Sequence, residues 1–130
     1  MKDLRLPWLW LGIWLVLIAA TIAVSLGPPA SGPDIPASDK WMHGLTYGGL
    51  ALVAVQVFRP GRPLLLAAAG LVLLGVGLEI GQGTLTSDRT MDWHDAVANS
   101  IGVALGTATA WLPLRDLLLR LAPARRTLSP

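Results

Sequence analysis

Four apolar stretches of nearly membrane-crossing length, separated by short charged segments, constrain the fold of this chain more than any other feature. They cover residues 8–26, 41–58, 63–80 and 96–112. A helix needs about 20 apolar residues to cross the hydrocarbon core of a bilayer, and each stretch approaches that length. Prolines follow the first stretch, and Arg59-Pro60-Gly61-Arg62 forms a turn after the second. The pattern predicts an all-α, polytopic integral membrane protein with four transmembrane helices.

Residues 114–121 follow the last apolar stretch and place charged residues among leucines at helical spacing. This pattern predicts a short C-terminal amphipathic helix at the membrane interface. A cleaved signal peptide is the weaker interpretation of residues 8–26, because their apolar run exceeds the roughly 7–15 residues of a signal core. We therefore expect residues 1–130 to form one membrane domain.

Composition excludes several classes of function. The chain has no cysteine, so it offers no disulfide, no thiolate nucleophile and no cysteine metal ligand. Its net charge is only +2, and its arginines lie at the ends of the apolar stretches. We therefore expect no nucleic-acid partner.

The basic residues indicate an orientation in the membrane. If four helices alternate in direction, one side receives Lys2, Arg5, Arg59, Arg62, Arg115, Arg120, Arg125 and Arg126, whereas only Lys40 and Arg89 fall on the other. Cytoplasmic segments carry the excess of Lys and Arg in membrane proteins. We therefore expect a multi-pass protein of the cytoplasmic membrane, with both termini in the cytoplasm.

Polar residues of three predicted helices gather at the outer end of the bundle. They are Asp39, Lys40, His43 and Tyr47 in the second, Glu79 and Gln82 in the third, and Arg89, Asp92, Asp95 and Asn99 in or before the fourth. Steps of three or four residues within each group place its members on one helix face. These residues are expected to form a polar seam inside the bundle, with the first helix outside it.

Two further features bear on how the seam is built. An unpaired Glu79 would cost about 2.5–3.5 kcal/mol at the centre of a membrane helix, so we expect it to be paired, with His43, Lys40 and Arg89 as open alternatives. Small-xxx-small pairs, which let membrane helices approach closely, occur at Gly44/Gly48, Gly77/Gly81 and Gly102/Gly106.

This ordered set of motifs resembles the VanZ-like family of bacterial membrane proteins. The resemblance covers residues 38–106, from Asp39-Lys40-x-x-His43-x-x-x-Tyr47 through Glu79-x-x-Gln82 to Arg89-x-x-Asp92-x-x-Asp95-x-x-x-Asn99. It implies a place in the cell envelope and an effect on susceptibility to teicoplanin and related lipoglycopeptide antibiotics. It assigns no chemical role to any residue.

The seam admits several functions. We favour an outer-face pocket that binds an anionic envelope lipid or lipid-linked precursor, with Lys40, Arg89 and His43 as donors. The alternatives are a membrane-embedded hydrolase or transferase that uses His43 as a base, and a structural protein whose seam only packs helices. A divalent metal on His43, Glu79, Asp92 and Asp95 is the weaker hypothesis, so we assign no metal or cofactor. The sequence leaves the oligomeric state open.

Overall fold

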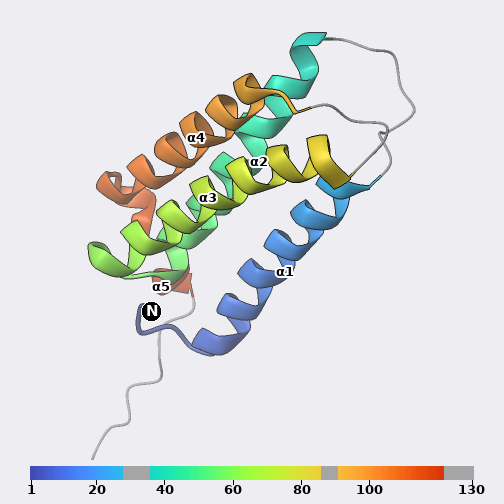
Figure 1. Cartoon of the computed structure of the whole chain (residues 1–130). Helices are drawn as coiled ribbons and strands as arrows, with labels where there is room; N and C mark the ends of the chain where they lie inside the picture. Colours follow the sequence, from blue (N-terminus) through green and yellow to red (C-terminus); the bar gives the residue numbers. More distant parts are fainter. Residues whose placement is uncertain (28–35, 86–90, 122–130) are drawn as a thin grey trace, which may run out of the picture.

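The computed structural model describes residues 1–27, 36–85 and 91–121, apart from the side chains of residues 36–39. Within these ranges the chain is all-α, as predicted (Figure 1). Its five α-helices are α1 (Pro7–Leu26), α2 (Pro36–Val57), α3 (Arg62–Leu85), α4 (Trp93–Ala108) and α5 (Leu117–Leu121). The short 3-10 helices η1 (Thr109–Trp111) and η2 (Pro113–Asp116) lie between α4 and α5.

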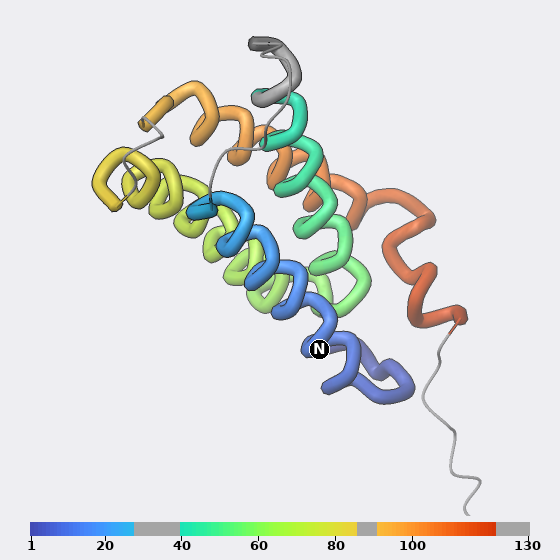
Figure 2. The backbone as a smooth tube through the Cα atoms, turned by 90° about the vertical axis from the view of Figure 1, so that its right-hand side faces the viewer, coloured from blue at the N-terminus to red at the C-terminus, as the bar shows by residue number. Residues whose placement is uncertain are grey.

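The four long helices lie side by side along a common direction (Figures 1 and 2). Helix α2 contacts α1, α3 and α4, and its packing with α4 is the most extensive in the described part of the chain. The turn from α2 to α3 contains Gly61 with a φ of 97°, a left-handed conformation that suits glycine. Helix α3 runs back along α2 after this turn, and α4 reverses direction again (Figure 1). Helices α2 and α4 therefore begin at the same end of the bundle and run parallel to each other.

Glycines bring α2 and α4 into backbone contact. A Cβ atom at Gly102 would overlap the Gly44 carbonyl group and lie 3.0 Å from the Gly48 nitrogen, and one at Gly106 would overlap the Gly48 carbonyl. Two of the three predicted glycine pairs therefore form this interface. The pair at Gly77 and Gly81 does not join it, because a Cβ at Gly77 would have no neighbour within 4 Å.

The described helices differ in whether they are long and apolar enough to cross a bilayer. Helices α1 and α3 are each long and apolar enough to cross a bilayer. The segments Trp93–Trp111 and Pro113–Leu121 reach that length only as one broken span, with a bend of 79°. Helix α2 has similar length, but polar residues in its first half reduce its hydropathy. The described chain thus has two candidate spans, or three if the bent pair counts as one.

The helix boundaries differ from the predicted apolar stretches where polar residues follow. Helix α2 begins at Pro36, before the apolar stretch at residue 41, and α3 continues to Leu85, beyond residue 80. Helical hydrogen bonding is internal to the segment, so it does not stop where apolar residues stop. The predicted helix over residues 114–121 is a 3-10 turn followed by α5, since Pro113 begins a new turn and cannot continue α4.

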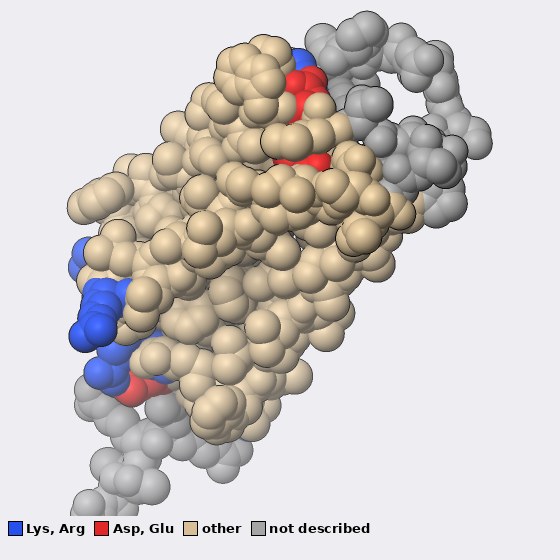
Figure 3. All heavy atoms as spheres, in the orientation of Figure 1, with Lys and Arg blue, Asp and Glu red and all other residues tan. Residues whose placement is uncertain are grey.

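Charges collect at the two ends of the bundle (Figure 3). At the basic end, the N-terminal segment is tied to α2 and η2: the Lys2 backbone N–H donates to the Val57 carbonyl at 2.9 Å, and the Lys2 ammonium lies 3.0 Å from Asp116. Arg59 donates to Asp3 at 2.7 Å. The opposite end carries the residues of the predicted seam.

Candidate functional site

The described seam residues meet at the end of the bundle where α2 and α4 begin and α3 ends. This polar cluster consists of Lys40, His43 and Tyr47 from α2, Glu79 and Gln82 from α3, and Asp92, Asp95 and Asn99 at or in α4. Five of these side chains are buried, namely Tyr47, Glu79, Gln82, Asp95 and Asn99. Arg89 and the side chain of Asp39 lie outside the described residues.

His43 is the centre of the polar cluster. Its Nδ1 atom lies 3.2 Å from Asn99 Oδ1, which is within hydrogen-bond distance, and 3.7 Å from Glu79 Oε1. Its Nε2 atom lies 3.9 Å from Asp95 Oδ2. Of the partners that the sequence left open for Glu79, His43 lies beside it, and Arg89 is outside the described residues.

Lys40 is paired with the carboxylates of α4. Its ammonium donates to Asp92 Oδ2 at 2.9 Å and to Asp95 Oδ1 at 3.1 Å. The two bonds join the beginning of α2 to the beginning of α4, at the same end as the glycine contacts begin. The positive charge of Lys40 is therefore already matched by carboxylates.

Asp92 caps α4 and is not part of its first turn. It lies at the N-cap with extended backbone, and its side chain accepts from the His94 backbone N–H at 2.9 Å. Helix α4 thus begins after Asp92, so the single helical face that we expected from Arg89 to Asn99 holds only for Asp95 and Asn99. The Lys40 ammonium, together with the His94 donors, keeps the pKa of Asp92 well below its ordinary value.

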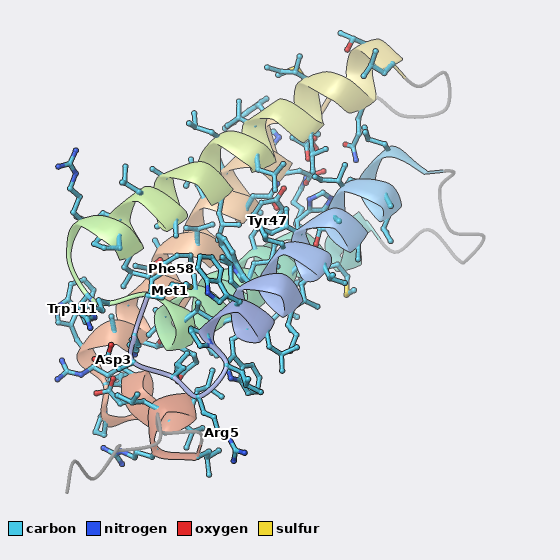
Figure 4. The ribbon with its side chains drawn as sticks, turned by 90° about the horizontal axis from the view of Figure 1, so that it is seen from below. Met1, Asp3, Arg5, Tyr47, Phe58 and Trp111 are labelled. Atoms are coloured by element: carbon cyan, nitrogen blue, oxygen red, sulfur yellow. The ribbon has the colours of Figure 1, made fainter. Side chains whose placement is uncertain are left out.

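Two buried oxygen atoms of the polar cluster lack hydrogen-bond partners among the described residues: Glu79 Oε2 and the Tyr47 hydroxyl. The Glu79 side chain is only 2% exposed, and the Asp92 backbone N–H donates to its carboxylate. Tyr47 lies inside the bundle, away from the end that carries Asp3 and Arg5 (Figure 4). Leaving a buried polar group unpaired typically costs about 1–3 kcal/mol, so these two atoms mark a place where a water molecule or a ligand would be stabilised.

Helix α1 takes part in the site, contrary to the expectation from sequence. Gln82 Nε2 donates to the Ser25 carbonyl near the end of α1 at 2.9 Å. This bond was not predictable, because a backbone acceptor leaves no sequence motif. The small residue Gly75 makes room on the α3 side, since a Cβ there would lie 3.1 Å from Asn99 and 3.3 Å from the Tyr47 ring.

A groove of about 690 Å³ runs between α1 and α2 and reaches the polar cluster. Apolar side chains form most of its walls, including Leu17, Val24, Leu50 and Val53. His43 and Tyr47 belong both to this lining and to the polar cluster. The groove therefore combines an apolar length with a polar end, which is the shape of a site for an amphiphile.

Comparison of the chain with known protein families, with curated proteins and with solved structures finds no match. What the site can bind therefore follows from its own residues. It offers a half-buried imidazole, two buried carboxylates that face that imidazole, and an apolar groove beside them.

Proposed function

We propose that this chain is a VanZ-like membrane protein whose polar cluster engages the headgroup of an anionic envelope lipid or lipid-linked precursor, while the lipid tail occupies the groove between α1 and α2. Through that lipid we expect the protein to change susceptibility to glycopeptide and lipoglycopeptide antibiotics. The chain forms one membrane domain over residues 1–130 in this proposal.

The proposal includes four membrane crossings with the polar cluster at the outer face. Packing supports the count, because α2 lies alongside α1, α3 and α4, and its polar residues face the polar cluster instead of lipid. Charge supports the orientation, because basic residues lie at the end opposite the polar cluster: Lys2 is hydrogen-bonded to Val57 at the end of α2, Arg59 follows that helix and Arg62 begins α3. Arg5 lies at the same end (Figure 4). Exposed tryptophans near both ends suit the two interfaces; they are Trp8, Trp41, Trp93 and Trp111.

The observation that carries the proposal is the place of His43 and Tyr47, which line the apolar groove and belong to the polar cluster at its end. A lipid has the same two-part character. A purely structural seam explains the bonds of Lys40 and Asn99 but leaves Glu79 Oε2 and the Tyr47 hydroxyl without partners among the described residues. A ligand at this end of the groove accounts for both.

Gly49 provides a test of the groove. It lines the groove, and a Cβ there would meet nothing within 4 Å, so Gly49→Phe fills the space without displacing the helices. Gly77→Phe is the matched control, because Gly77 is equally unobstructed but lies outside the groove lining. Native mass spectrometry of the full chain in mild detergent measures retention of phosphatidylglycerol and phosphatidylcholine.

We expect the original chain and Gly77→Phe to retain phosphatidylglycerol preferentially, and Gly49→Phe to lose it. Equal retention of the two lipids, or equal retention by the two variants, would contradict the proposal. Orientation is tested separately with single cysteines in this cysteine-free chain. Met91→Cys is expected to react with an impermeant maleimide added to intact cells, and Pro60→Cys is expected to react only after lysis.

A further inference from the structure

Three helices each deliver one potential metal ligand to the same point. His43 from α2, Glu79 from α3 and Asp95 from α4 offer ligand atoms that all lie within 4.8 Å of one another. His43 Nδ1 lies 3.7 Å from Glu79 Oε1, and the other ring nitrogen, Nε2, lies 3.9 Å from Asp95 Oδ2. Bonds of about 2.0–2.2 Å place two ligands of one ion roughly 3.0–3.5 Å apart, so the three side chains must rotate inwards to bind one ion, with His43 contributing a single ring nitrogen.

The unpartnered atoms described above point to a ligand at this place independently of the spacing. Glu79 is 2% exposed at its side chain, and its Oε2 atom has no hydrogen-bond donor among the described residues. The buried Tyr47 hydroxyl beside it also has no hydrogen-bond partner among the described residues. A cation beside Glu79 would neutralise a buried carboxylate that the described hydrogen bonds leave half satisfied.

Neighbouring side chains orient two of the three candidate ligands, His43 and Asp95. Asn99 Oδ1 accepts from His43 Nδ1 in the tautomer that has its proton on Nδ1, and in that tautomer Nε2 carries the lone pair that would bind an ion. Lys40 takes only Oδ1 of Asp95, so Oδ2 faces His43. Outer partners of this kind, which fix the tautomer and the ring orientation, accompany most histidine ligands in metalloproteins.

The charge of the polar cluster also favours a bound cation. In the described part of the chain it holds three carboxylates, Glu79, Asp92 and Asp95, against the single ammonium of Lys40. Such a surplus of negative charge repels a phosphate headgroup. Among the described residues, a cation between the phosphate of an anionic lipid and these carboxylates would remove the repulsion.

We propose that His43, Glu79 and Asp95 bind one divalent transition-metal ion, such as Zn²⁺, whose open coordination positions face the groove and accept a phosphate oxygen of the headgroup. One imidazole with two carboxylates is a donor set for such ions and requires no cysteine. His43 lines the groove and is 14% exposed at its side chain, which gives the ion a path of entry. The headgroup contact rests on the proposed lipid function, whereas ion binding itself does not.

The test uses the full chain in lipid-free detergent, stripped with a chelator and carrying no histidine tag. Titration with Co²⁺, followed by its visible absorption, and with Zn²⁺, followed by calorimetry, is expected to give one ion per chain. His43→Gln and Glu79→Gln are expected to weaken binding beyond the roughly 10–100-fold that loss of an outer partner causes. The matched control is His94→Gln, because His94 is the other histidine of the chain and is outside the ligand set.

Absence of stoichiometric binding, or equal loss in His43→Gln and His94→Gln, would overturn the metal site. If Glu79→Gln fails to fold, the metal site is tested with the original chain and His43→Gln alone. Their melting temperatures are measured with and without Zn²⁺, and only the original chain is expected to gain stability. Retention of phosphatidylglycerol is then compared with Zn²⁺ and with chelator. Zn²⁺ binding without lipid retention supports the site and rejects the lipid function, whereas lipid retention that ignores the chelator rejects the bridging role of the ion.

Discussion

The close contact between α2 and α4 allows the effect of Gly102→Ala on the free energy of unfolding to be estimated. The new Cβ would lie 3.0 Å from the Gly48 nitrogen and overlap the Gly44 carbonyl group. Both obstacles are backbone atoms of a helix, so no side-chain rotation relieves the clash and the two helices must separate. Overpacking of this kind typically costs about 1–3 kcal/mol. The gain of about 0.5–1 kcal/mol from replacing glycine within a helix offsets only part of that cost.

We therefore expect Gly102→Ala to lower the free energy of unfolding by roughly 0.5–2 kcal/mol, up to about a thirtyfold change in the folding equilibrium. Gly77→Ala has the same gain in helix propensity and no neighbour within 4 Å, so it is expected to be neutral or slightly stabilising. Unfolding of both variants by sodium dodecyl sulfate in mixed micelles, followed by far-ultraviolet circular dichroism, gives the comparison. Equal stability of the two variants would refute the packing argument.

The same substitution also tests how the site is held together. Gly44 follows His43 directly, and Gly102 lies one helical turn after Asn99, so the glycine contact and the His43–Asn99 contact share the same interface. Separating the helices lengthens the 3.2 Å distance between His43 and Asn99. We expect Gly102→Ala to weaken Zn²⁺ binding as well, although Gly102 is not a ligand in the proposed site.

Lys40→Met is expected to destabilise the chain near neutral pH and to lose this effect in acid. Lys40 lowers the pKa of Asp92 in the folded state, so this pair stabilises the fold at pH values above the ordinary aspartate pKa of about 3.9. The stabilisation is lost as the pH falls through the lowered pKa. The difference in unfolding free energy between Lys40→Met and the original chain should shrink steadily as the pH is lowered from 7 to 2, and a constant difference would contradict this assignment. Trp14→Phe is expected to cost about 1 kcal/mol in the same unfolding assay, because the buried Trp14 Nε1–H donates to the Leu50 carbonyl at 2.9 Å. Trp8→Phe, at a position that is 75% exposed, should leave stability unchanged, and an equal loss there would refute the role of the hydrogen bond.

The sequence predicts the helices and the end at which the polar residues gather, because both follow from apolar length and helical spacing. The four long helices overlap the four apolar stretches, and Lys40, His43, Glu79 and Asp95 do lie at one end of the bundle. Repeated glycines permitted the close approach of α2 and α4 without predicting it, because the same pattern occurs at Gly77 and Gly81. These features depend on local sequence alone.

The pairing within the site was not predictable, because it depends on how each helix is rotated about its axis. That rotation is set where Gly44 and Gly48 meet Gly102, whereas the equally suggestive pair at Gly77 is exposed. The choice of His43 as the neighbour of Glu79 follows from this rotation. The role of α1 was missed because its contribution at Ser25 is a carbonyl group, which any residue supplies.

The groove beside α1 has a consequence for how a ligand would be selected. In the described chain, α1 joins its neighbours through the hydrogen bonds of Trp14 and Ser25, and the groove runs along α1 between these levels. Under the proposed function, a lipid entering there would move sideways within its own leaflet, and its tail would pass from one apolar surrounding to another. Transfer of the tail then contributes little to discrimination between lipids. Selectivity would rest on the few polar atoms around His43, so a change of one atom there alters the choice of lipid more than any change in tail length.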